Sequence, residues 1–122
     1  MVRMSHARPA YQKVGPSLDL NLELRPLWIP AEVFTVHYAR DAGYGEAVTV
    51  TVTKRSVGRD DVVIDTKTGL TAASWTFNFF ALPIILLHGD SLVITTSVSQ
   101  PQAGEWQSAR IDWVEVPAGV AR

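Results

Sequence analysis

The segment at residues 17–25, Ser-Leu-Asp-Leu-Asn-Leu-Glu-Leu-Arg, alternates a leucine with a polar residue at every step. A period of two places side chains of like character on one face of a β-strand, whereas a helix would scatter the four leucines around its circumference. Asp19, Asn21 and Glu23 then share the opposite face. A straight strand spaces these oxygen-bearing side chains about 7 Å apart, whereas a calcium site needs about six to eight oxygens curled around the ion. The segment therefore predicts a strand with one buried face and one solvent face.

The same alternation recurs along the chain and predicts an all-β fold. Valine, isoleucine and threonine, which favour strands, make up 31 of the 122 residues. Further strands are expected at 32–38, with Phe34, Val36 and Tyr38 on the inner face, and at 47–53, 62–66, 75–79, 92–96 and 109–114. About seven to eight short strands without a helical period describe a two-layer antiparallel β-sandwich that is jelly-roll-like.

The chain divides into three parts by composition. Residues 1–16 predict an extended N-terminal arm, 17–116 a single β-sandwich domain, and 117–122 a C-terminal tail. Residues 1–18 hold three basic residues and no acidic one, while residues 19–122 hold 12 acidic and 8 basic residues. A basic arm before an acidic body suggests docking on an acidic neighbouring surface, and an ordinary solvated terminus is the alternative. The arm residues expected at such an interface are Arg3, Arg8, Tyr11 and Lys13.

Overall composition argues against several classes of protein. The net charge of −1 predicts no nucleic-acid partner and no binding to an anionic membrane surface. The longest apolar run is nine residues, interrupted by Pro83, which is too short to cross a bilayer as a helix. Residues 1–20 lack the apolar stretch of a secretory signal, so we expect no signal peptide. The absence of cysteine excludes disulfides and thiolate metal sites.

The sequence contains no recognisable catalytic or metal-binding pattern. There is no phosphate-binding glycine-rich loop and no Gly-x-Ser-x-Gly elbow. His6, His37 and His88 are separated by 31 and 51 residues, so a zinc site would depend wholly on the fold. A jelly-roll enzyme would need His37 or His88 to meet carboxylates in a pocket. The sequence therefore predicts a protein that is not an enzyme and binds no metal or cofactor.

Residues 79–87, Phe-Phe-Ala-Leu-Pro-Ile-Ile-Leu-Leu, form an apolar run without a polar residue. A strand with one wet face would interrupt such a run, so both faces are expected to be covered. The cover is either a loop of the same chain or another subunit. Burial by another subunit would place Phe80, Leu82, Ile84 and Ile85 at an interface.

The four tryptophans divide by their surroundings. Trp75 and Trp113 lie in predicted strands and are expected in the core. Trp28 and Trp106 lie beside proline or glycine loops and are expected to be exposed. An exposed tryptophan serves a protein interface or a sugar-binding platform equally well, so both functions stay open.

Residues 80–95, Phe-Ala-Leu-Pro-Ile-Ile-Leu-Leu-His-Gly-Asp-Ser-Leu-Val-Ile-Thr, resemble a pattern of small β-sandwich virion proteins of tailed bacteriophages. There, an apolar-proline stretch leads into Gly-Asp and a strand. The resemblance implies a capsid decoration or cement protein that binds other virion proteins, such as major capsid or tail subunits, and works as a homo-oligomer. It implies localisation in the virion after synthesis in the host cytoplasm, and it brings no catalytic residues. A tail or head–tail connector component and a carbohydrate-binding module are the alternatives.

Overall fold

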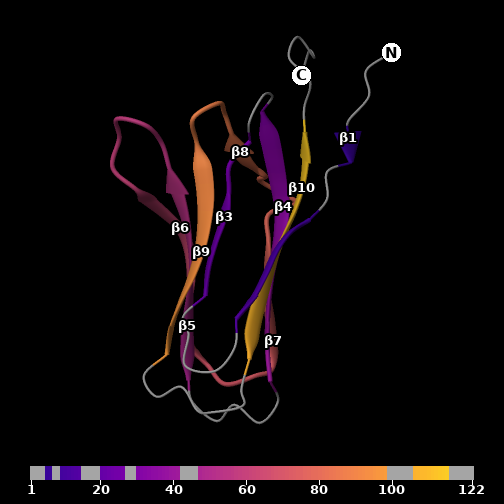
Figure 1. Ribbon diagram of the computed structural model, residues 1–122, viewed down its shortest axis with the longest axis vertical. Coiled ribbons are helices and arrows are strands. Elements are labelled where there is room, and N and C mark those ends of the chain that lie inside the picture. Colours follow the sequence, from indigo (N-terminus) through magenta and orange to yellow (C-terminus); the bar gives the residue numbers. More distant parts are fainter. Residues whose placement is uncertain are drawn as a thin grey trace.

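The computed structural model describes residues 5–6, 9–14, 20–26, 30–41, 47–98 and 106–115. Within these ranges the chain forms ten β-strands and no helix. The strands build two antiparallel sheets that lie face to face (Figure 1). The predicted all-β, two-layer sandwich is confirmed.

The two sheets share the strands unequally. Sheet A contains β1 (Ser5–His6), β2 (Ala10–Val14), β4 (Ala31–Arg40), β7 (Ser74–Asn78), β8 (Ile84–Leu86) and β10 (Gln107–Glu115). In it, β10 pairs with β1 and β2 on one side and with β4 on the other, and β4 pairs in turn with β7 and β8. Sheet B contains β3 (Asn21–Leu24), β9 (Ser91–Val98), β5 (Val48–Arg55) and β6 (Val62–Leu70), in that order. Successive strands change sheet at most connections, as they do in a jelly roll.

Part of the predicted N-terminal arm is a strand of sheet A. β2 runs antiparallel to β10, with Tyr11 opposite Arg110. Ala10 and Val14 pack against the core, whereas Tyr11 and Lys13 are exposed on the outer face. The remainder of the arm, apart from residues 5–6 and Pro9, and the predicted tail at 117–122 lie outside the described residues.

The core lies where the inner faces of the two sheets meet. Sheet B and the residue before β3 supply the leucines of the opening alternation and the valines of β5, none more than 7% exposed: Leu20, Leu22, Leu24, Val48, Val50 and Val52. Sheet A supplies Val33, Val36, Tyr38, Phe77, Leu86, Ala109 and Ile111, among others. Burying each large aliphatic side chain stabilises the fold by about 1.5–3 kcal/mol. Leu18, the first leucine of the alternation, lies outside the described residues.

A β-bulge on β4 changes the facing of one aromatic residue. β10 pairs with Thr35 and then with Val33, so Phe34 is an extra residue on β4. The ring of Phe34 stacks on Phe80 at a centroid distance of 5.6 Å and is not part of the core. The prediction that Phe34 lies on the inner face is therefore wrong, because an inserted residue shifts the two-residue period.

The side of the sandwich between β6 and β7 is only partly closed. The prediction that Trp75 lies in the core is wrong, because β7 is an edge strand of the described sheet and Trp75 is 38% exposed. The ammonium of Lys67 on β6 reaches across and lies 4.3 Å from the centroid of the Trp75 ring. Lys67 and Asp65 pair with Val50 and Val52, whose side chains are in the core. The edge strand β6 thus turns two charged side chains toward the gap between the sheets.

The apolar run at 79–87 is not a single strand. The first residues of the run form a turn that follows β7. The strand β8 then begins directly after Pro83. Ile84 and Leu86 are buried, whereas Ile85 and Leu87 are 41% and 54% exposed. Cover by a loop of the same chain is therefore wrong for Ile85 and Leu87. Cover by another subunit stays a prediction. Buried and exposed side chains do alternate in β8. The alternation is not visible in the hydropathy of the sequence, because the exposed positions also carry apolar residues.

Candidate functional site

The described surface exposes nine large hydrophobic side chains, and seven of them gather at one end of the sandwich. These seven lie at the β5–β6 hairpin, between β7 and β8, on β8 and just after it: Val57, Val62, Val63, Phe80, Leu82, Ile85 and Leu87. We call this surface the apolar end, and its hairpin and β8 lie at the top of Figure 1. Exposed apolar side chains that gather in one region of a surface mark an interaction site more often than scattered single residues do.

The Gly-Asp pair of the 80–95 segment holds the apolar end to the body of the sandwich. Gly89 has a φ of 90°, a left-handed conformation that favours glycine. Asp90 N–H donates to the Leu87 carbonyl at 2.9 Å, and Leu87 N–H donates to Asp90 Oδ2 at 3.0 Å. Lys54 Nζ donates to the Ile85 carbonyl at 2.9 Å and lies 3.7 Å from Asp90 Oδ2. The motif therefore has a structural role: it fixes the turn that presents the apolar residues.

The carboxylate of Asp90 stays charged because of its partners. Burial alone would raise the pKa of Asp90, but the Leu87 N–H, the Ser56 hydroxyl and the Lys54 ammonium together lower this pKa below its ordinary value of 3.8. The contacts that hold the turn are therefore present throughout the neutral pH range.

Two hollows shape the apolar end. A cleft of about 410 Å³ opens between β6 and the β7–β8 loop, with Ile64, Phe79 and Leu82 in its lining. A second hollow of about 290 Å³ lies beside the stacked rings of Phe34 and Phe80. Hollows lined by apolar side chains are the places where a partner's anchoring residues are desolvated.

The sequence anticipated part of the apolar end. Phe80, Leu82 and Ile85 lie in it as exposed residues, whereas Ile84 is buried in the core at 6% exposure and only lines the cleft beside β6. The members that sequence reasoning missed are Val57, Val62 and Val63. They join the apolar end because the β5–β6 hairpin lies beside the turn after β8, a long-range contact that no local pattern shows.

The other predicted interface residues lie elsewhere or outside the described ranges. Tyr11 and Lys13 lie on the outer face of sheet A, and the Lys13 ammonium lies 4.8 Å from the centroid of the half-buried Trp106 ring. Trp113 is half-buried and packs against the core. Arg3, Arg8 and Trp28 lie outside the described residues.

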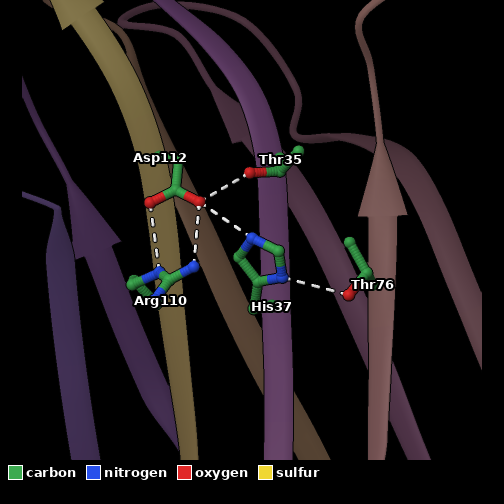
Figure 2. A network of polar contacts seen from close by, with 5 residues as sticks. All are labelled: Thr35, His37, Thr76, Arg110 and Asp112. Atoms are coloured by element: carbon green, nitrogen blue, oxygen red, sulfur yellow. Dashed lines mark hydrogen bonds and ion pairs between the residues drawn. The ribbon is translucent and has the colours of Figure 1, made fainter.

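A polar network crosses three strands on the outer face of sheet A (Figure 2). The Thr35 hydroxyl donates to Asp112 Oδ2 at 2.7 Å, and Nε2 of His37 lies 2.8 Å from the same oxygen. Arg110 Nε lies 3.1 Å from Asp112 Oδ1. On the other side, His37 Nδ1 lies 3.0 Å from the Thr76 hydroxyl. The network therefore links β10, β4 and β7.

This network places the His37 imidazole against the Asp112 carboxylate. A jelly-roll enzyme would need a contact of this kind in a pocket. With a neutral imidazole, Nε2–H donates to Asp112 and the Thr76 hydroxyl donates to Nδ1, so a hydroxyl, a base and an acid stand in line. The same carboxylate also serves Thr35 and Arg110, which lie on the two strands it joins. The contacts of Asp112 with Thr35 and His37 and that of His37 with Thr76 cross between strands, whereas the Arg110 contact lies within β10, so each is accounted for by anchoring of sheet A.

The described ranges hold neither a metal-binding cluster nor a membrane-spanning helix. No group of three His, Cys, Asp or Glu side chains there is arranged to hold a metal ion. The described residues include no helix long and apolar enough to span a bilayer.

No family model and no curated protein matches the sequence. Among solved structures, the mitogen of Yersinia pseudotuberculosis is similar at 6% identity, with a TM-score of 0.44, over 99% of this chain and 92% of that chain. A chain of tomato aspermy virus is similar at 11% identity, with a TM-score of 0.41, over 100% and 86%. A chain of infectious bursal disease virus, Gx strain, is 15% identical, with a TM-score of 0.40, over 95% of this chain and 35% of that chain. This chain thus spans about a third of the bursal disease virus chain.

Proposed function

We propose that this chain is a non-enzymatic structural protein of a virus particle, and specifically a capsid decoration or cement protein of a tailed bacteriophage. The observation that carries the proposal is the gathering of seven exposed large hydrophobic side chains at one end of the sandwich. That end would bind neighbouring virion subunits or further copies of the chain. The resemblance of residues 80–95 to small phage virion proteins supplies the biological setting.

The energetics of the apolar end suit repeated attachment to a symmetric particle. Burying one exposed leucine against a partner contributes about 1.5–3 kcal/mol before the cost of association is subtracted. One such surface gives a modest affinity, and many copies on a regular lattice raise the total attachment strongly. The rigid turn at Gly89 and Asp90 favours binding further, because little conformational freedom is lost there.

The non-enzymatic part of the proposal is supported by the use of His37 and Asp112 as a cross-strand anchor. A hydrolase built on Thr76 would show turnover of an activated ester such as p-nitrophenyl acetate. We expect the full chain to hydrolyse this ester no faster than its Thr76→Val variant does. Faster hydrolysis by the unaltered chain would overturn this part of the proposal.

The direct test of a virion role uses virus particles from cells that carry the gene. Particles purified on a density gradient are analysed by mass spectrometry and by electron microscopy with a labelled antibody. We expect the chain in many copies per particle, with label over the head. Label confined to the tail or the head–tail junction would replace decoration by the connector alternative, and particles without the chain would overturn the virion role.

A double variant tests whether the apolar end is the attachment surface. Leu82→Ser with Leu87→Ser removes two exposed leucines without touching the core. We expect particles made with this variant to carry far fewer copies of the chain. Tyr11→Ser is the matched control, since Tyr11 is 59% exposed but lies on the outer face of sheet A. Equal incorporation of the double variant and the control would show that attachment uses another surface.

A further inference from the structure

A second surface feature, separate from the apolar end, hollows the outer face of sheet A. The hollow has a volume of about 340 Å³, near the lower end of the ~300–1,000 Å³ range of small-molecule sites. Its floor is a row of small side chains on three neighbouring strands: Ser108 on β10, Ala39 opposite it on β4, and Ser74 opposite Ala39 on β7. Small residues in one row leave a depression between the larger residues of the rows beside it.

The next row along the strands forms the wall of the hollow. Tyr11, Arg110, His37 and Thr76 stand opposite one another on β2, β10, β4 and β7. Tyr11 is 59% exposed, so a large part of its side chain is available to a ligand. Arg110 and His37 are held in place by Asp112, as Figure 2 shows. Arg110 and His37 are therefore ordered before any ligand arrives, which lowers the entropic cost of binding.

The guanidinium that lines the hollow is balanced by a carboxylate, which favours a neutral ligand. Arg110 contacts both oxygens of Asp112, with Nε 3.1 Å from Oδ1 and Nη2 3.3 Å from Oδ2, and His37 contacts the same carboxylate. The positive charge of the guanidinium is thus balanced, and the wall holds no surplus cation for a phosphate or a carboxylate. The groups left to contact a ligand are an aromatic ring, three hydroxyl groups and the edge of a guanidinium.

We propose that this hollow binds a neutral saccharide. The Tyr11 ring packs against the C–H face of a sugar ring, because an aromatic side chain offers a flat apolar surface with a polar tip. Ser74, Ser108 and Arg110 exchange hydrogen bonds with the sugar hydroxyls, since together they supply both donors and acceptors. This proposal does not rest on the virion role, because it uses a different face of the molecule.

The test is a titration of the full chain with neutral oligosaccharides by isothermal calorimetry. The probes are maltohexaose, cellohexaose, xylohexaose and N-acetylchitohexaose. We expect at least one probe to bind, and we expect Tyr11→Ala to weaken that binding about tenfold, while Tyr11→Trp retains it. Ala39→Leu fills the floor and should abolish binding without removing a polar group. Melting curves of each variant establish that it is folded.

Trp106→Ala is the control, because Trp106 is the other aromatic platform considered for sugars and is absent from the lining of this hollow. Binding that survives in Ala39→Leu, or that is lost in Trp106→Ala but not in Tyr11→Ala, would overturn the proposed site. So would the absence of heat with all four probes at concentrations up to about 10 mM, since a weaker affinity is below that of a functional site. The apolar-end variant should bind the probe as the unaltered chain does.

Discussion

Asp112 is the residue on which the outer face of sheet A depends. It accepts a hydrogen bond from Thr35 and contacts Arg110 and His37. Burial alone would raise the pKa of Asp112, but the Thr35 hydroxyl and the charges of Arg110 and His37 lower this pKa below its ordinary value of 3.8. A carboxyl whose pKa is lower in the folded state stabilises the fold above its unfolded pKa. That contribution is lost as the pH falls through the folded value.

Asp112→Asn should therefore lower the melting temperature in a pH-dependent way. We expect a loss of about 1–2 kcal/mol near pH 5, because hydrogen bonds to a charged group are lost at a partly solvated site. The difference from the unaltered chain should shrink as the pH falls through the lowered pKa of the folded Asp112 carboxyl, because the native carboxylate is then protonated as well. Thermal melts followed by circular dichroism measure this difference. A difference that does not change with pH would show that the carboxylate charge is not its source.

Among the elements, β8 is a three-residue strand that serves the core and the surface at the same time. Ile84 is 6% exposed and its neighbour Ile85 is 41% exposed. Ile84→Ala and Ile85→Ala are thus a matched pair of equal chemistry. We expect the first to lower the free energy of unfolding by about 2–4 kcal/mol and the second by about 0.5 kcal/mol. Urea unfolding curves measure both, and equal losses would contradict the assigned facing of β8.

The elements also show how far a sequence can be interpreted by itself. The alternation at 17–25 and the valines of 47–53 identified β3 and β5, because one face of each strand is polar and the other is buried. Phe34, Trp75 and Ile84 were misplaced, because of a bulge opposite β10, a sheet edge, and a core-facing position on β8 that its apolar neighbours concealed. The candidate site was identified only in part, since the β5–β6 hairpin joins it through the fold.

In the topology of the whole molecule, most strands bury their apolar faces against strands that are distant in the sequence. Successive strands change sheet at most connections, and β10 at the end of the chain pairs with β1 and β2 at its beginning. Closing such distant pairings costs chain entropy before contacts are gained, which slows folding. The two ends of the chain must therefore meet before sheet A is complete.

Refolding from urea should accordingly take milliseconds to seconds, as for other β-sandwiches, and not microseconds. Ala109→Gly on β10 should slow refolding or speed unfolding, since Ala109 is a buried residue at the centre of sheet A. Stopped-flow tryptophan fluorescence measures both rates. Complete refolding within about 100 µs would contradict this expectation.

The inward-turned charges of β6 have a consequence for how copies of this protein can be arranged. A foreign strand that extended sheet B at β6 would have to strip water from Asp65 and Lys67, so the edge resists open-ended stacking into fibrils. The apolar end carries no such barrier. Strand addition at the β6 edge is therefore disfavoured while end-on contact is permitted, so crowded copies of the chain are directed to meet through the apolar end and not along β6.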